Sequence, residues 1–162
     1  ATYRQDKGEE LYRRGMYTFI KLTVPPPGMV MFDASNRDQC EVKRLKTNTP
    51  LQALIMMNDP TVLEASRVLA QNLATEQSSA PEKIQKAFRL IICRKPSARE
   101  QDILSKYFTE QLQLFRQEKI DAKATMSVGE FPLKQLPDMN QAAALMRTIN
   151  MIYNMEEAIT KT

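Results

Sequence analysis

The chain has 162 residues, of which 43% are hydrophobic and 26% are charged, as in an ordinary soluble globular domain. It contains two cysteines and no histidine, so histidine general bases, Ser–His and Cys–His catalytic pairs and c-type haem attachment are excluded, as are most zinc sites. The net charge of +4 permits anionic partners without requiring one. No apolar stretch reaches the length of about 18 residues that a transmembrane helix needs.

The first predicted element is a helix over residues 9–21, because apolar side chains recur there at three- and four-residue spacing. Three prolines at 25–27 end it, since proline lacks an amide donor and disfavours helical geometry in the preceding residue. This run is predicted to be extended and stiff, with a turn at Gly28 and an irregular stretch over 29–46. The inward face predicted for the first helix consists of Tyr12, Met16, Phe19 and Ile20.

Two explicit helix starts follow. The sequence TPLQ puts Thr49 at the N-cap, Pro50 at the first helical position and Gln52 three residues after the cap. Asp59, followed by a proline, starts the next helix in the same way. The inward faces predicted for these two helices are Leu51, Leu54, Ile55 and Met56, and Val62, Ser66, Leu69 and Leu73.

Three further helices complete the predicted fold. One spans 81–93, one begins at the capping box of Ser97 and Glu100, and the last begins at Asp138 after a long loop over 120–137. Their inward faces are Ile84, Ala87, Phe88 and Ile91, then Leu104, Tyr107, Phe108, Leu112 and Phe115, then Ala142, Leu145, Met146, Ile149, Ile152 and Tyr153.

Because no strand pattern of comparable length occurs, the sequence predicts an all-α fold. We expect a single helical domain over 1–162, a bundle of about six helices with an ordered proline-rich crossover loop. The chain starts without a methionine, and we expect it to be the C-terminal fragment of a larger multidomain protein.

The crossover loop also holds the candidate site. Asp33, Ser35, Asn36 and Asp38 could supply oxygens to a calcium ion, but they lack the alternating order, central glycine and closing glutamate of a calcium loop. Turn formation accounts for the same residues, so neither a metal nor a cofactor is predicted.

The basic sequence KRLK at 43–46, with Arg37 nearby, could hold an anion, and Arg44 is its best bidentate donor. A nucleic-acid site would be broader, more basic and accompanied by stacking aromatics, so this partner is not favoured. Cys40 and Cys93 could pair in an oxidising compartment, although two half-buried free thiols are the simpler expectation.

Residues 11–67 resemble a known family. The matching features are Arg13, Tyr17 and Thr18, the proline run, Phe32 and Asp33, Arg37, Cys40, Arg44, the sequence TNTPLQAL at 47–54, and Asn58 and Asp59. Together they resemble the planctomycete-specific C-terminal domain of unknown function that is found in large envelope proteins, often with cytochrome-c-like modules. Gly129, Ala142, Ala143 and the sequence NMEEAIT at 154–160 resemble the closing part of that family's domain.

The resemblance implies export to the periplasm or cell surface and a role inside a multidomain protein, but it implies no reaction. No catalytic constellation is visible, and we expect a non-catalytic module that acts through contacts with other domains of the same protein or with an envelope protein. The alternatives are a polysaccharide-related binding or hydrolytic accessory domain and a weak nucleic-acid or anion binder. The candidate ligand or partner contacts are Asp33, Asn36, Arg44, Lys46 and Asn48.

Overall fold

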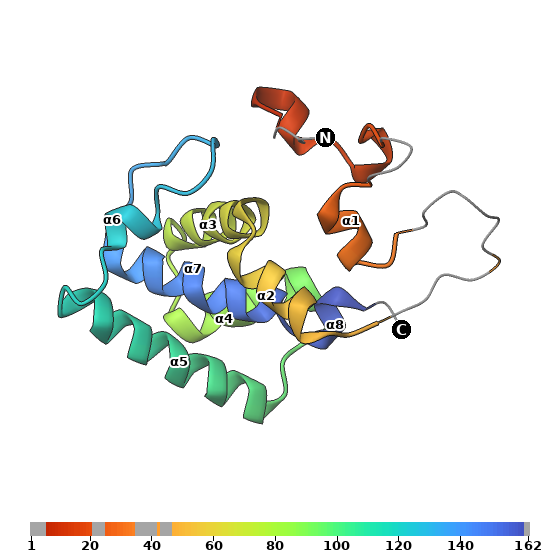
Figure 1. Cartoon of the computed structure of the whole chain (residues 1–162). Helices are drawn as coiled ribbons and strands as arrows, with labels where there is room; N and C mark the ends of the chain where they lie inside the picture. Colours follow the sequence, from red (N-terminus) through yellow and green to blue (C-terminus); the bar gives the residue numbers. More distant parts are fainter. Residues whose placement is uncertain (1–5, 21–24, 35–41, 43–46, 161–162) are drawn as a thin grey trace. The chain divides into compact units, whose positions relative to one another are not determined.

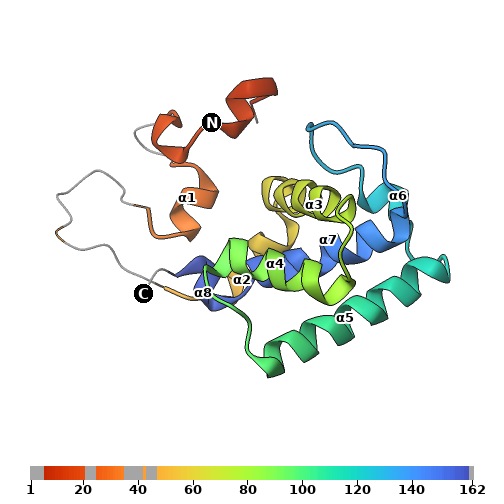
Figure 2. The same ribbon diagram turned by 180° about the vertical axis from the view of Figure 1, so that it is seen from behind.

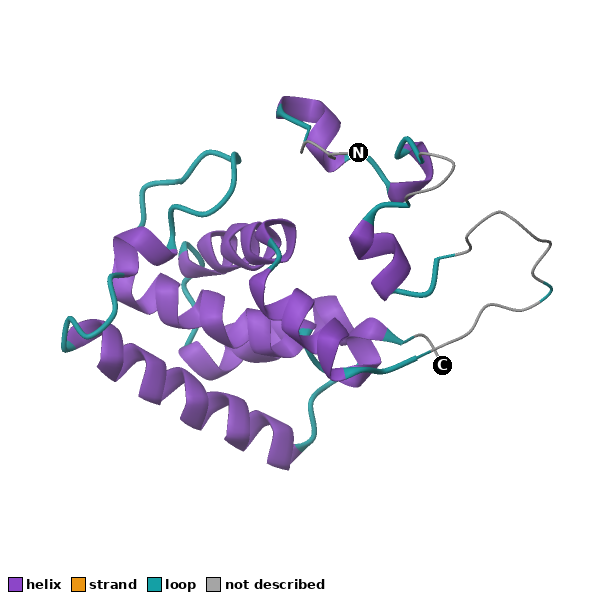
Figure 3. Ribbon diagram, viewed as in Figure 1, coloured by secondary structure: helices purple, strands orange, loops and turns teal. Residues whose placement is uncertain are grey.

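The structure, a computed structural model, describes residues 6–20, 25–34, 42 and 47–160. The chain divides into two compact units, Ala1–Gln52 and Ala53–Thr162, which are described separately. All regular elements in the described ranges are helical (Figure 3), which confirms the all-α fold class. The expectation of a single domain stays a prediction.

The first unit lacks the helix that was expected over 9–21. Two short 3-10 helices, η1 Gly8–Tyr12 and η2 Gly15–Tyr17, stand there instead, with extended backbone at Arg13 and Arg14 between them. A glycine within the segment costs a helix about 1 kcal/mol relative to alanine. Since neither 3-10 helix buries a residue, no packing offsets that cost. The expected inward residues Tyr12, Met16 and Phe19 are exposed.

The proline run begins a helix instead of ending one. Pro26 is extended, but Pro27 is the first residue of helix α1, Pro27–Met31. The first helical position needs no amide donor, and proline's fixed φ suits it. The predictions of a turn at Gly28 and of irregular structure from residue 29 were therefore wrong. Most of the predicted irregular stretch, residues 35–41 and 43–46, lies outside the described residues.

Helix α2, Pro50–Asn58, starts where TPLQ predicts. The Thr49 N–H donates to Gln52 Oε1 at 2.9 Å, and the Gln52 N–H donates to Thr49 Oγ1 at 3.3 Å, which completes the capping box. The expected apolar face is wrong in part, because Leu51 and Leu54 are exposed while Gln52 is the buried residue of this helix.

The second unit is built around one central helix. Figures 1 and 2 show α7 running through its middle, with α3 on one side and α5 on the other. A single helical turn, α6, interrupts the loop that was expected to run from 120 to 137. The remaining helices of this unit are α3 Pro60–Ala74, α4 Ala80–Ile92, α5 Ala98–Arg116, α6 Ala122–Thr125, α7 Met139–Tyr153 and α8 Glu156–Ile159.

The core of the second unit lies around α7, whose predicted inward face is confirmed. Its buried residues begin with three consecutive alanines, Ala142, Ala143 and Ala144, which let the neighbouring helices approach closely. No helix in the described part of the chain is long and apolar enough to cross a membrane. The hydrophobic core consists of Ala70, Leu73, Ile84, Ala87, Phe88, Leu104, Phe108, Phe115, Ala122, Met126, Ala142, Ala143, Ala144, Leu145, Met146, Ile149 and Ile152.

Candidate functional site

Two of the five predicted site residues, Asp33 and Asn48, lie in the described part of the chain. Asn36, Arg44 and Lys46 lie outside it, as does Cys40. Asn48 is exposed, whereas Asp33 is half-buried. Cys93, which was expected to be half-buried, is an exposed free thiol at the end of α4.

The Asp33 carboxylate binds its own chain. Asp33 has a positive φ of 54°, a conformation in which aspartate is one of the tolerated residues. Its Oδ2 accepts hydrogen bonds from the N–H of Thr47 at 2.9 Å and from Thr47 Oγ1 at 2.6 Å. The hydroxyl hydrogen bond and the amide hydrogen bond of Thr47 lower the pKa of Asp33 below its usual value.

Gln52 strengthens the same junction from the first turn of α2. Its Nε2 donates to the carbonyl of Met31 at 2.7 Å and to Thr47 Oγ1 at 2.9 Å. These bonds join residues 31–33 to residues 47–52. An exposed cleft around Asp33 would favour a ligand site, but the observed bonds favour a structural clasp.

A second polar cluster, which sequence reasoning missed, lies on α3. The side chains of Glu64 and Arg67 are only 5% and 1% exposed, and Arg67 Nη2 lies 3.5 Å from Glu64 Oε1. Arg67 Nε donates to the Val128 carbonyl at 2.7 Å, and Nη2 donates to the Phe131 carbonyl at 2.6 Å. The guanidinium thus binds the backbone of a loop more than 60 residues away.

The other α3 side chains complete this attachment. Glu64 Oε1 accepts a short hydrogen bond from the Phe131 N–H. Gln71 donates to the Pro132 carbonyl and accepts from the Lys134 N–H, both at 3.4 Å. We call residues 128–134 the anchored loop. In Figure 1 the anchored loop is part of the connection between α6 and α7, and this connection lies beside α3.

The anchored loop directs its large apolar side chains into solvent. Phe131 and Leu133 are each 42% exposed, although the backbone between them is fixed on α3.

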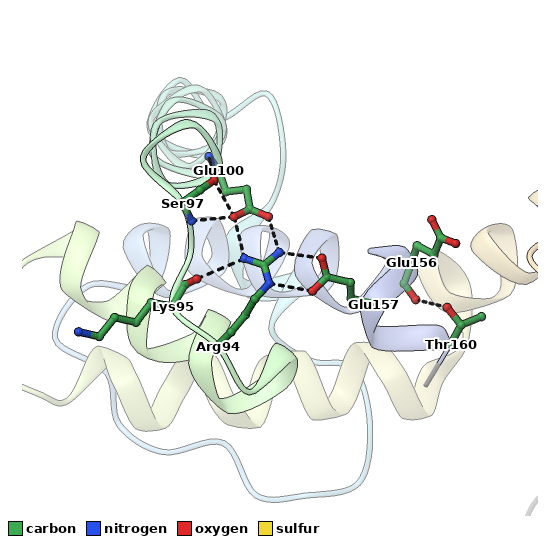
Figure 4. A network of polar contacts seen from close by, with 7 residues as sticks. All are labelled: Arg94, Lys95, Ser97, Glu100, Glu156, Glu157 and Thr160. Carbon is green, nitrogen blue, oxygen red and sulfur yellow. Dashed lines mark hydrogen bonds and ion pairs between the residues drawn. The ribbon is translucent and has the colours of Figure 1, made fainter. Parts of the chain in front are cut away.

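A third polar cluster surrounds Arg94, between α4 and α5 (Figure 4). Arg94 Nη1 and Nη2 bind Glu100 Oε2 and Oε1 at 2.9 and 2.6 Å. Arg94 Nε and Nη2 bind Glu157 Oε2 and Oε1 at 2.8 and 2.7 Å. The hydrogen bonds from Arg94, aided by those from Ser97, lower the pKa of Glu100 to about 2. Arg94 likewise lowers the pKa of Glu157.

The remaining candidates carry no reactive arrangement. No group of three or more His, Cys, Asp or Glu side chains that could hold a metal occurs in the portion described. A shallow hollow of about 420 Å³ on the outer side of α4 is lined by Glu82, Gln85, Lys86, Arg89 and Leu90. Glu82 already accepts a hydrogen bond from Ser79, and Lys86 already binds Glu76, so both charged groups have structural partners.

The fold and its polar clusters define an all-α helical protein in which side-chain contacts to the backbone hold loops in place. Residues 1–108 match PSD1, the family described as a protein of unknown function (DUF1553). The match covers two thirds of the chain, which therefore belongs to this family. No curated protein and no solved structure matches the chain. The likeness of residues beyond 108 to the family stays a prediction.

The anchored loop predicts the effect of Gly129→Ala. Gly129 has a φ of +86°, and a Cβ there would overlap the side chain of Glu64. The variant should therefore lose roughly 2–4 kcal/mol of unfolding free energy from backbone strain and overpacking. Urea unfolding followed by circular dichroism measures this. Gly28→Ala is the matched control, since no heavy atom lies within 4 Å of its added Cβ and its φ is ordinary. Equal effects of the two variants would contradict the proposed anchoring.

The Arg94 cluster predicts a pH dependence of stability. The folded pKa of Glu100 is about 2, against an ordinary value of 4.5. The charged form is therefore favoured by folding, and its contribution is present above pH 4.5 and lost as the pH falls toward 2. Glu100→Gln should lower the urea midpoint at pH 7, and the difference from wild type should shrink steadily between pH 4.5 and 2.

The control for this experiment is Glu110→Gln, an exposed position on the same helix. Its urea midpoint should follow that of wild type at every pH. A constant difference between Glu100→Gln and wild type over the whole range would show that the charge of Glu100 plays no part.

Proposed function

We propose that this chain is a non-catalytic helical module that acts through contacts with protein. The partners would be other domains of the same protein or an envelope protein, in the periplasm or at the cell surface, as the family resemblance implies. The planctomycete setting and the neighbouring cytochrome-c-like modules belong to the same proposal. The observation that carries it is the anchored loop, which holds Phe131 and Leu133 in solvent on a fixed backbone.

The energetics of the anchor support this proposal. A buried ion pair usually gains little net stability, because the desolvation of its charges offsets their attraction. Glu64 and Arg67 nevertheless fix the loop, and the loop does not bury Phe131 or Leu133 in return. A rigid loop loses little conformational entropy when a partner covers it, so its apolar side chains are ready for binding.

The size and surroundings of this surface favour a protein partner over a lipid bilayer. An interfacial membrane element is typically an amphipathic helix with an extended apolar face and several basic residues. The anchored loop is not helical, and its two exposed apolar residues are flanked by one acidic and one basic residue, Glu130 and Lys134. Two apolar side chains on a stiff, proline-containing backbone suit a small pocket on a protein.

The proposal predicts that Phe131 and Leu133 become covered in the cell. Hydroxyl-radical footprinting with mass spectrometry should label both residues in the purified chain and label them several-fold less in the intact cells that produce it. Leu90, exposed on α4, is the accessible reference, and Phe115, buried in the core, is the inaccessible one. Equal labelling of Phe131 in the two samples, after normalisation to Leu90, would argue against a partner at this surface.

The alternative ligand classes are separated by thermal melting of the chain with glycans, divalent metals and nucleic acid. A ligand at 100 times its dissociation constant adds about 2.7 kcal/mol of stability. We expect no such shift, because Asp33 is bound to Thr47. Asp33→Asn should lower the melting temperature without any ligand. A shift that a glycan induces and that Arg44→Ala removes would instead favour the polysaccharide-related function. A shift that nucleic acid induces, that salt weakens and that the double substitution Arg44→Ala with Lys46→Ala removes would favour the nucleic-acid or anion binder.

A further inference from the structure

We propose that α8 is a releasable latch, held on the corner between α4 and α5 by the ion pair of Glu157 with Arg94. The latch comprises residues 156–160. The inference is independent of the proposed protein contact at the anchored loop, since it concerns different residues at the C-terminal end of the second unit.

The first observation is how little of α8 is buried. The helix has only four residues, Glu156–Ile159, and none of them is buried, although Met155 directly before it packs against the core. A helix of this length is not stable in isolation, because one turn does not repay the cost of nucleation. Its internal bonds run from the Ala158 N–H to the Met155 carbonyl at 2.9 Å and from the Thr160 N–H to the Glu156 carbonyl at 2.8 Å.

The second observation is the geometry at Arg94. Its guanidinium presents one edge, Nε and Nη2, to Glu157 and another, Nη1 and Nη2, to Glu100. It also lies 4.9 Å from the centre of the Phe88 ring. Two-point contacts of this kind fix orientation as well as distance. Figure 4 shows the two carboxylates on different sides of the same guanidinium.

The two carboxylates differ in how firmly the rest of the fold holds them. Glu100 lies in the first turn of α5, accepts from the N–H of Ser97 at 2.7 Å and from its Oγ at 2.8 Å, and is 24% exposed. Glu157 is 50% exposed and is bound to Arg94, as Figure 4 shows. The Glu157 side of the cluster is therefore the weaker one.

Release of the latch leaves the rest of the cluster in place. Glu100 and Phe88 still hold the guanidinium when Glu157 departs, and the core residues of α7 remain covered by α3, α4 and α5. Opening is thus local, and it frees the Nε–Nη2 edge of an already oriented arginine for another carboxylate. A local opening of this kind has a free energy below that of global unfolding.

Amide hydrogen exchange of the full chain tests the latch. In Glu157→Gln, the Ala158 and Thr160 amides should exchange roughly three- to fivefold faster than in wild type, the range expected for a solvent-accessible ion pair. Amides in the middle of α7, such as those of Leu145 and Ile149, should exchange at the wild-type rate. These amides also report whether the variant is folded.

The matched control is Glu156→Gln. Both substitutions remove one negative charge from the first turn of α8, so they weaken the helix-dipole interaction similarly. The Glu156 carboxylate, however, points away from Arg94 in Figure 4, and its loss should leave the Ala158 and Thr160 amides close to their wild-type rates. Unchanged exchange of these amides in Glu157→Gln, equal acceleration in both variants, or acceleration of the α7 amides by the same factor would each overturn the proposal.

Discussion

The burial of Arg67 is the constraint on which the exposed surface of the second unit depends. A guanidinium carries five N–H donors and cannot lose its charge in a protein, so a side chain with 1% exposure must find acceptors nearby. Carbonyls in the middle of a helix such as α3 are already used within the helix. The carbonyls of Val128 and Phe131 supply the missing acceptors, and Glu64 supplies the opposite charge. The position of the anchored loop follows from this requirement.

The same physical device appears at three places in the part of the chain that the structure describes. Asp33 with Gln52, Arg67 with Glu64, and Arg94 with Glu100 each join segments by side-chain contacts at the ends of helices or within loops. Backbone groups in a loop need partners as much as those in a helix do. Side chains that satisfy them give a loop a fixed shape without a strand or a helix, and leave its apolar side chains free to face outward.

The sequence predicted the helices best where their signals are local. The capping box of Thr49 and Gln52, that of Ser97 and Glu100, and the N-cap at Asp138 each lie within four residues, and each starts a helix in the structure. The inward face of α7 was also predicted, because its period is that of a helix and its residues are buried on one side. The segment over 9–21 has the same period but contains Gly15, and two 3-10 helices form instead, neither of which has a side-chain cap bond. Apolar periodicity therefore predicts a helix reliably only when a start signal accompanies it.

The candidate site was harder to predict because its bonds connect distant residues and end on backbone carbonyls. Asp33 was recognised as important, but Thr47 lies 14 residues away and nothing in the sequence pairs them. The acceptors of Arg67 lie 61 and 64 residues further on, and a carbonyl has no signature in the sequence. The sequence offered little help here: Glu64, Arg67 and Gln71 recur at three- and four-residue spacing on one face of α3, opposite Leu73, which is the pattern of a solvated polar face. The structure nevertheless buries all three residues, and since charged side chains are almost never fully buried without a partner, another segment must cover them. The segment that covers them is the glycine-containing loop before α7, and the glycine permits the close approach, because a Cβ at Gly129 would overlap Glu64.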